Sequence, residues 1–286
     1  MRPEPQPAAA PKSILITGAY GLVGNGLFAH LDRRPDRYRV YGLGRRMARS
    51  QRLKADNCYP IDQRQYRVAD VADLPAMIEA VKGMDVVVHA AADPGSNDWE
   101  SILTNNIRGV RNVLEACRTN GVSRIVLTSS AQVNWGYGQL PEYREAFSGA
   151  CAELPPGLRR IRHTDPPKPV SLYGASKVWM EALAHVYAMT HGLSCICVRI
   201  GWATPAGWPD RRMVFPSWCS MRDLTQLLEK VIQAPASLRF DIFNGVSDNR
   251  CRWADIEHAR EVLGYAPEDR SEDFEERLKR KEEQKR

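Results

Sequence analysis

Tyr173 and Lys177 stand four positions apart in the segment Tyr-Gly-Ala-Ser-Lys. If this segment is helical, the two side chains lie one above the other on the same face. A free phenol ionises near pH 10 and is too weak a base at neutral pH, but a neighbouring ammonium favours the phenolate and lowers its pKa. The spacing therefore predicts that Tyr173 is a general acid/base and that Lys177 tunes it.

Ser130 supplies a third group of the kind that such a centre needs. It follows the apolar run at residues 124–128, where a buried strand is expected to end. A hydroxyl at a strand end can donate a hydrogen bond to the oxygen that gains or loses a proton. The sequence thus predicts a catalytic centre of Ser130, Tyr173 and Lys177.

A glycine-rich turn lies near the start of the chain, in Thr-Gly-Ala-Tyr-Gly-Leu-Val-Gly at residues 17–24. Gly18 permits a tight turn, Gly21 lets the backbone approach a pyrophosphate, and Gly24 allows the following helix to pack closely on the strand. Phosphates would then lie at the helix N-terminus, where free N–H groups favour anions. The predicted dinucleotide-binding residues of this turn are Gly18, Tyr20, Gly21, Leu22, Val23 and Gly24.

The choice of cofactor depends on the end of the second strand, where an acidic residue would bind the ribose 2′-hydroxyl of NAD. This chain has Gly44-Arg45-Arg46 there instead. Arg45 or Arg46 could hold a 2′-phosphate through charge-assisted hydrogen bonds, so NADP is predicted, with NAD possible. The alternative is a solvated pair of surface arginines. Two further groups complete the predicted cofactor site. Asp70 and Val71 would meet the adenine, and Ala90, Ala91 and Ala92 would flank the nicotinamide ribose. Lys177 would also bind that ribose.

The elements that must position these residues alternate along the chain. Apolar strands are predicted at residues 13–17, 38–43, 65–69, 85–89, 124–128, 194–199 and 239–243. Amphipathic helices are predicted at residues 22–31, 75–81, 104–119, 171–191, 221–233 and 253–263. Uniformly apolar strands separated by helices indicate an α/β fold, a Rossmann-type doubly wound parallel sheet covered on both faces.

The chain divides into four predicted parts: a flexible tail at 1–12, a dinucleotide-binding Rossmann domain at 13–203, a small interleaved substrate-binding region at 204–267, and a charged tail at 268–286, frayed from about 269. Within the Rossmann domain, residues 135–169 lose all periodicity and are rich in Gly, Pro and charge. A stretch of this length without regular structure is usually functional.

Composition excludes several classes of protein. The 286 residues carry a net charge of +6, but acidic residues interrupt the basic ones, so nucleic-acid binding is not expected. No run of about 18 apolar residues exists, which argues against a membrane span. The seven cysteines include no CxxC pair and are expected to be buried thiols in a cytoplasmic protein, and no metal site is predicted.

The whole pattern resembles the extended branch of the short-chain dehydrogenases/reductases over residues 13 to about 267. Within that branch it is similar to uronate dehydrogenases and NAD-dependent glucose-6-phosphate dehydrogenases, through the segments at 89–94, 172–177, 198–201, 245–249 and 262–265. The resemblance implies that Asn106 braces the active-site strand, and that Ile200 belongs to the cofactor site. It also implies a homodimer formed through the helices that contain Asn112 and Tyr173.

The same resemblance implies a substrate site of Pro94, Ser130, Gln132, Trp202 and Arg212. Gln132 replaces a histidine that helps to bind the sugar, and Trp202 replaces a substrate-contacting serine. Arg212 corresponds to the arginine that holds a uronate carboxylate, with Arg211 one register away as the alternative. These changes put the relatives' own substrates in doubt for this chain.

The segment between Ser130 and Tyr173 is longer than the resemblance implies and rich in aromatic residues, which could form a lid over a small substrate or ordinary packing under a long loop. Its aromatic residues are Trp135, Tyr137, Tyr143 and Phe147, and Trp202 and Trp208 would face them across the cleft.

The function predicted from these residues is an NAD(P)-dependent oxidoreductase of the EC 1.1.1 type. It would transfer hydride between a nicotinamide and a hydroxyl or carbonyl of a small sugar-like or other polar substrate. Two alternatives remain at this point: a nucleotide-sugar epimerase or dehydratase on the same fold, and a cofactor-binding regulator without activity. Stoichiometric turnover of free cofactor distinguishes the oxidoreductase from both alternatives.

Overall fold

A computed structural model describes residues 10–95, 98–149 and 153–284. Its centre is a seven-stranded parallel sheet with the strand order β3-β2-β1-β4-β5-β6-β7. The strands are β1 (Lys12–Thr17), β2 (Tyr38–Gly44), β3 (Tyr66–Val68), β4 (Val86–His89), β5 (Arg124–Ser130), β6 (Ser194–Ile200) and β7 (Phe240–Gly245). The chain winds outward from β1 to β3, returns to β4, and continues in the other direction. This confirms the predicted doubly wound fold and leaves a switch point between β1 and β4.

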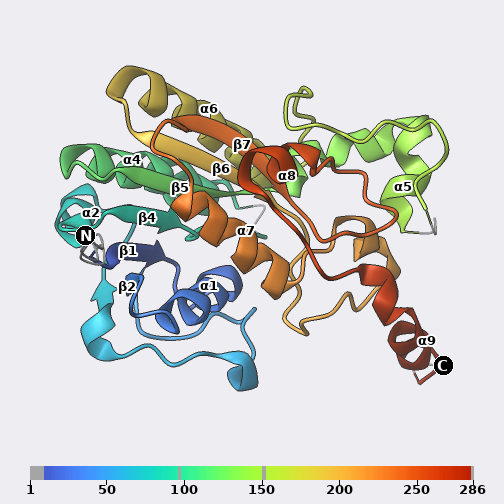
Figure 1. The fold of residues 1–286 in the computed structure, drawn as a ribbon, viewed down its shortest axis with the longest axis horizontal. Helices are drawn as coiled ribbons and strands as arrows, with labels where there is room; N and C mark the ends of the chain where they lie inside the picture. Colours follow the sequence, from blue (N-terminus) through green and yellow to red (C-terminus); the bar gives the residue numbers. More distant parts are fainter. Residues whose placement is uncertain (1–9, 96–97, 150–152, 285–286) are drawn as a thin grey trace, which may run out of the picture.

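Helices cover both faces of the sheet (Figure 1). One layer holds α2 (Leu74–Val81), α4 (Gly109–Thr119) and α6 (Leu172–His191), and the other holds α1 (Leu22–Asp32) and α7 (Met221–Gln233). Successive residues of β1 explain the two cores, since Ile14 and Ile16 pack with α1 and α7 whereas Leu15 packs with α2 and α4. Strands that are apolar on both faces are what a sheet buried between two helical layers requires.

The predicted long helix at 104–119 begins earlier and in a different geometry. A short helix, α3 (Trp99–Ser101), runs into a π-helical segment at Ile102–Arg108, and α4 follows. Insertions of this type interrupt the regular hydrogen-bond ladder and occur frequently at functional sites. Here the π segment carries Asn106.

Short turns and one short helix occupy the first part of the irregular stretch expected at 135–169, whereas residues 153–170 contain no helix or strand. They are 3-10 segments at Ala131–Gln139 and Pro141–Tyr143, and α5 (Arg144–Ser148). Another helix, α8 (Glu257–Leu263), begins four residues later than predicted. Smaller 3-10 turns lie at Ala55–Asn57, Gln63–Gln65 and Arg212–Ser217.

The C-terminal segment is ordered, so the expectation of a frayed tail from about residue 269 is wrong over most of its length. A 3-10 turn at Ser271–Phe274 leads into α9 (Glu275–Glu283), at the opposite end of the molecule from α2 (Figure 1). Leu278 is 1% exposed and packs against Trp208 and Phe215. A single apolar residue anchors this charged helix, which is why composition alone did not indicate it. The predicted N-terminal tail at 1–12 lies mostly outside the described residues, and Lys12 already belongs to β1.

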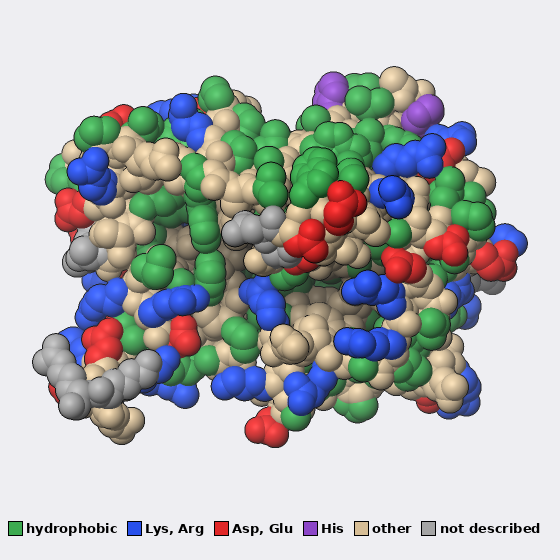
Figure 2. All heavy atoms as spheres, turned by 180° about the vertical axis from the view of Figure 1, so that it is seen from behind, with side chains coloured by type: hydrophobic (Ala, Val, Ile, Leu, Met, Phe, Trp, Pro, Cys, Tyr) green, Lys and Arg blue, Asp and Glu red, His purple; other side chains and the backbone are tan. Residues whose placement is uncertain are grey.

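Charge is mixed on the surface. In Figure 2, Lys and Arg side chains gather on the lower half of the face, with Asp and Glu side chains among them. None of the helices within the described residues is long and apolar enough to cross a membrane.

The cysteines match the predicted buried thiols only in part. Cys58, Cys117, Cys195, Cys197 and Cys219 are free, and all of them except the partly exposed Cys58 are buried. Cys251 is disulfide-bonded, which corrects the expectation for that residue. Cys151 lies outside the described residues.

Candidate active site

A cleft of about 760 Å³ opens at the carboxyl ends of β1, β4, β5 and β6. Ligands of open α/β sheets bind at this edge. The cleft brings together most of the predicted site: Gly21, Leu22, Val23, Gly24, Arg46, Ala90, Ala92, Pro94, Ser130, Gln132, Tyr173, Lys177, Ile200 and Trp202.

The glycine turn has the close contacts that the motif predicts. Gly18 adopts φ +67°, and a Cβ there would lie 2.9 Å from the Cα of Ala91. A Cβ at Gly24 would lie 2.3 Å from the carbonyl oxygen of Gly18, so only glycine lets α1 start this close to β1. Gly21 is the N-cap of α1, and the first turn that follows carries no acidic residue. The first turn of α1 therefore lines the cleft with a helix N-terminus, whose free backbone N–H groups suit a pyrophosphate.

Tyr173 lies in the first turn of α6, which Ser171 caps by accepting a hydrogen bond from the Gly174 N–H at 3.0 Å. Gly174 permits a close approach, because a Cβ there would be 2.8 Å from the carbonyl oxygen of Gln132. Burial raises the pKa of Tyr173 to about 12. A hydrogen bond from Ser130 and the positive charge of Arg52 act in the opposite direction and lower it. The phenol and the predicted serine thus line the same cleft and interact, as the centre requires.

Lys177 is 2% exposed, and its Nζ donates to the carbonyl oxygen of Thr128 at 2.7 Å. The same Nζ lies 5.5 Å from the centre of the Tyr173 ring. Burial lowers the pKa of Lys177 to about 8. The charges that act on the phenol in this structure are those of Arg52 and Asp93, and the tuning role of Lys177 stays a prediction. The ammonium is directed at the Thr128 carbonyl.

The buried Asn106 side chain supports the catalytic centre through hydrogen bonds. The Asn106 amide Nδ2 donates to the carbonyl oxygen of Asp93 and to Oγ of Ser176, each at 3.1 Å, and its Oδ1 accepts from the Asp93 N–H. Asn106 therefore links the loop after β4 to α6, whereas the resemblance implies a brace on the active-site strand.

A buried ion pair joins α6 to β6, next to β5. Arg199 donates to both carboxylate oxygens of Glu181, at 2.9 and 2.8 Å, and Ser129 donates to Glu181 at 2.6 Å. Because Ser129 precedes Ser130, this pair fixes the strand end that carries the catalytic hydroxyl. In the sequence, this pair appears only as a charged residue in each of two largely apolar segments, Glu181 in the predicted helix at 171–191 and Arg199 in the predicted strand at 194–199.

Several residues of the predicted site lie outside the lining of the cleft. Tyr20 packs against Tyr66, with ring centroids 5.4 Å apart, and the Asp70 carboxylate accepts from the Ala72 N–H at 2.9 Å. Arg212 forms an ion pair with Glu275 at 3.4 Å, so α9 draws it away from the cleft. The others outside the lining are Gly18, Arg45, Val71, Ala91 and the brace Asn106.

The cleft also contains residues that sequence reasoning did not assign to it. Arg52 and Asp93 line it and carry the charges that act on Tyr173. Arg52 belongs to an irregular, arginine-rich segment after β2, and nothing periodic there indicated that it turns back to the catalytic tyrosine.

Trp135 stacks on Trp202 at the cleft, with ring centroids 5.9 Å apart and planes 10° apart. The other aromatic residues of the proposed lid pack in the core or under loops. Tyr137 and Tyr143 contact each other, Phe147 stacks on Trp253, and Trp208 packs with α9. Of the aromatic residues predicted for the lid and the facing side of the cleft, Trp135 and Trp202 line the cleft.

Comparisons with known proteins agree with this site. A family model described as the NAD-dependent epimerase/dehydratase family matches residues 14–203, and the chain belongs to that family. Its most similar relatives include an NAD-dependent glucose-6-phosphate dehydrogenase from Haloferax volcanii, 32% identical over 91% of this chain and 95% of the relative. A uronate dehydrogenase from Pseudomonas syringae pv. tomato is 34% identical over 74% of this chain and 70% of the relative.

Solved structures give the same result. The crystal structure of uronate dehydrogenase from Agrobacterium tumefaciens is 29% identical, covers 95% of this chain and 90% of its own, and has a TM-score of 0.76. A variant of that enzyme has been solved in complex with NAD. These comparisons confirm the resemblance stated from the sequence and the predicted class, an NAD(P)-dependent oxidoreductase of the EC 1.1.1 type.

Proposed function

We propose that this chain oxidises a hydroxyl of a small sugar or sugar acid, with Tyr173 as the base that removes the hydroxyl proton. The observation that carries the proposal is the single cleft that holds Ser130, Tyr173 and Lys177 beside the glycine turn. Relatives named for dehydrogenation of glucose 6-phosphate, L-arabinose and uronate support a sugar substrate. The Ser130 hydroxyl would donate to the reacting oxygen, and the buried ammonium of Lys177 would orient a ribose hydroxyl.

The chain fits a nicotinamide dinucleotide, because the glycines at 18, 21 and 24 let the turn pack tightly on β1 and the loop after β4, and residues 21–24 line the cleft at the start of α1. Gly21 to Gly24 would hold the pyrophosphate, and Lys177 with Ala90 and Ala92 would hold the nicotinamide end. The bound cofactor supplies the hydride acceptor. We propose that NADP is preferred, because Arg46 lines the cleft and the second strand ends without an acid.

The substrate is proposed to be anionic. Arg46 and Lys177 are assigned to the cofactor, which leaves Arg52 as the cationic side chain for the substrate, and Asp93 is the one carboxylate among the described residues that line the cleft. Arg52 lies near Tyr173 and takes the role that the resemblance gave to Arg212. Gln132 is held in place by the Ser171 hydroxyl, which donates to its Oε1 at 3.0 Å.

The decisive experiment measures reduced cofactor at 340 nm with purified protein, NAD or NADP, and a panel of aldoses, uronates and sugar phosphates. The proposal expects stoichiometric reduction with at least one anionic sugar. Interconversion of a nucleotide sugar without net cofactor reduction would instead support the epimerase alternative. Cofactor binding with neither activity would support the regulator.

Homodimer formation and a cytoplasmic location also remain proposals. Val186 and Met189, on the outer face of α6, are 47% and 55% exposed, which suits a subunit contact through that helix. The five free cysteines suit a reducing compartment, whereas the disulfide at Cys251 does not. Light scattering and cell fractionation test these two points.

A further inference from the structure

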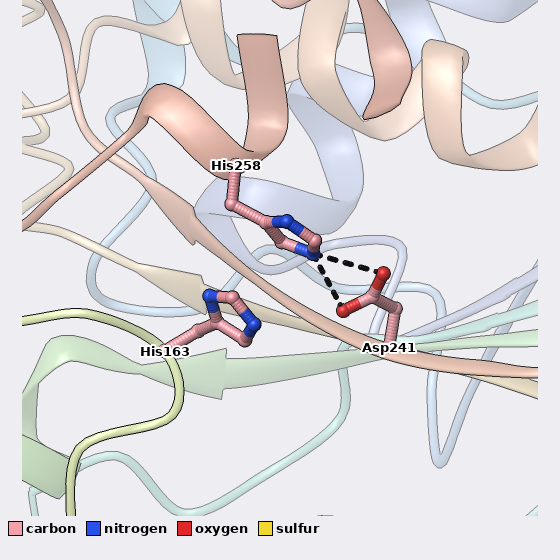
Figure 3. Close-up of side chains that lie close together, drawn as sticks. All are labelled: His163, Asp241 and His258. Carbon is pink, nitrogen blue, oxygen red and sulfur yellow. Dashed lines mark hydrogen bonds and ion pairs between the residues drawn. The ribbon is translucent and has the colours of Figure 1, made fainter. Parts of the chain in front are cut away.

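Three side chains from distant parts of the sequence meet at the edge of the sheet, outside the lining of the catalytic cleft (Figure 3). They are His163 from the segment before α6, Asp241 from β7, and His258 from α8. One potential ligand atom from each lies within 4.8 Å of the others. All three side chains are partly buried, so they are shielded while remaining open to an ion from solvent.

The orientation of this cluster is fixed by its own contacts. Nε2 of His258 lies 2.9 Å from both carboxylate oxygens of Asp241. The Asp241 carboxylate also accepts the Ile242 N–H at 2.7 Å. The His258 ring stacks on Phe243 at 5.0 Å and on His163 at 3.9 Å. One ring nitrogen of His163 is on the side that faces the Asp241 carboxylate (Figure 3).

We propose that His163, Asp241 and His258 bind a zinc ion, although the sequence gave no indication of a metal. Two imidazole nitrogens and one carboxylate oxygen form a donor set typical of Zn²⁺, with water as the fourth ligand. Zinc takes such ligands at about 2.0–2.2 Å, so the ion would lie between the three side chains. Because the imidazole rings are nearly parallel, binding requires His163 to rotate until its nitrogen converges with that of His258.

The position of the site indicates a structural role, in which the ion would connect three segments of the chain. Residues 161–163 already run beside 253–255, since the Ile161 N–H donates to the Trp253 carbonyl at 2.7 Å and the Asp255 N–H donates to the Ile161 carbonyl at 2.9 Å. Zinc would add a bond from His163 to β7 and α8. It would therefore fix the segment before α6, which is longer than the family resemblance implies.

A second contact connects this site to the catalytic centre. Arg199, which holds Glu181 behind Ser129, also donates to the carbonyl oxygen of His163 at 3.3 Å. Fixing His163 therefore also fixes one partner of the buried ion pair. The zinc is expected to stabilise the fold without contacting the substrate.

The test uses full-length, tag-free protein dialysed against a chelator and then titrated with Zn²⁺ by calorimetry. One equivalent of zinc is expected to bind to the wild type and to raise its Tm. His163→Ala and His258→Ala are each expected to bind zinc at least about a hundredfold more weakly, more than the loss seen for outer-shell partners of metal sites. Matched controls are His185→Ala, an exposed histidine on α6, and Cys58→Ser, which removes a partly exposed thiol.

Cobalt provides a second measurement that does not depend on the variants folding normally. Co²⁺ added to the dialysed wild type should give the intense visible bands of a four-coordinate site, and Zn²⁺ should displace them. Absence of stoichiometric Zn²⁺ binding by the wild type would overturn the proposal. So would full retention of binding by both His163→Ala and His258→Ala, or its loss in Cys58→Ser.

Discussion

The Arg52 guanidinium and the Tyr173 phenol face the same cleft, and the charge of Arg52 lowers the phenol pKa that burial raises. This relationship assigns part of the tuning of the base to a residue from the loop after β2. The buried Lys177, in contrast, is directed at the Thr128 carbonyl.

Arg52→Ala is expected to move the pH profile of sugar oxidation to higher pH. The base is active only when deprotonated, and the pKa of Tyr173 is raised to about 12 in the chain without cofactor. The rate should therefore rise about tenfold per pH unit while the phenol is mostly protonated. Removing Arg52 raises the pKa further, so kcat at saturating cofactor and substrate should fall at each pH below the plateau. Arg46→Ala, which alters another arginine of the cleft, is the control, and superimposable profiles for Arg52→Ala and wild type would contradict the assignment.

Tyr173→Phe is expected to lower turnover by at least about a hundredfold, the lower range for losing a general base. Cofactor affinity should stay near the wild-type value, because the phenol oxygen acts in proton transfer and the residues proposed to bind the pyrophosphate are unchanged. Steady-state kinetics and cofactor fluorescence titration measure the two effects. Near-normal turnover in this variant would remove Tyr173 from the mechanism.

Arg46 and Arg45 form a matched pair for cofactor choice. Arg46 lines the cleft, whereas its neighbour Arg45 lies outside the lining. Losing a hydrogen bond to a charged group costs about 1.5–3 kcal/mol, so Arg46→Ala should weaken NADP binding about 10- to 100-fold. NAD binding should change little in either variant, and Arg45→Ala should leave the NADP dissociation constant nearly unchanged. Tighter binding of NAD than of NADP by the wild type would contradict the proposed preference.

The predictable parts of this protein are those that local sequence determines. The glycine turn and the Tyr173–Lys177 spacing each lie within one short segment, and the structure places them as expected. Arg212 lies outside the lining of the cleft and pairs with Glu275 of α9, a charged helix whose one apolar residue, Leu278, is buried. Arg52 and the cluster at His163 depend on long-range loop packing, which leaves no periodic trace in the sequence.

The buried pair of Glu181 and Arg199 is expected to be essential for stability. Both side chains are at most 6% exposed, and removing one partner of such a pair typically costs about 3–5 kcal/mol because the other charge is left buried. Glu181→Leu and Arg199→Leu should each lower the free energy of unfolding by that amount in urea titrations. The double variant should recover much of the loss, because no uncompensated charge remains. Additive losses in the double variant would contradict this account of the pair.

Trp202→Ser is expected to widen substrate acceptance toward bulkier polar sugars. Trp202 stacks on Trp135 at the cleft, and a serine would remove a large apolar surface and leave Trp135 with one free face. Arg212→Ala should leave the KM for acidic sugars unchanged, since Arg212 is paired with Glu275 outside the lining, whereas Arg52→Ala should raise that KM. Kinetics with matched neutral and acidic sugars separate these effects. A large rise in KM for the acidic sugar in Arg212→Ala, with Arg52→Ala unaffected, would return the anion-binding role to Arg212.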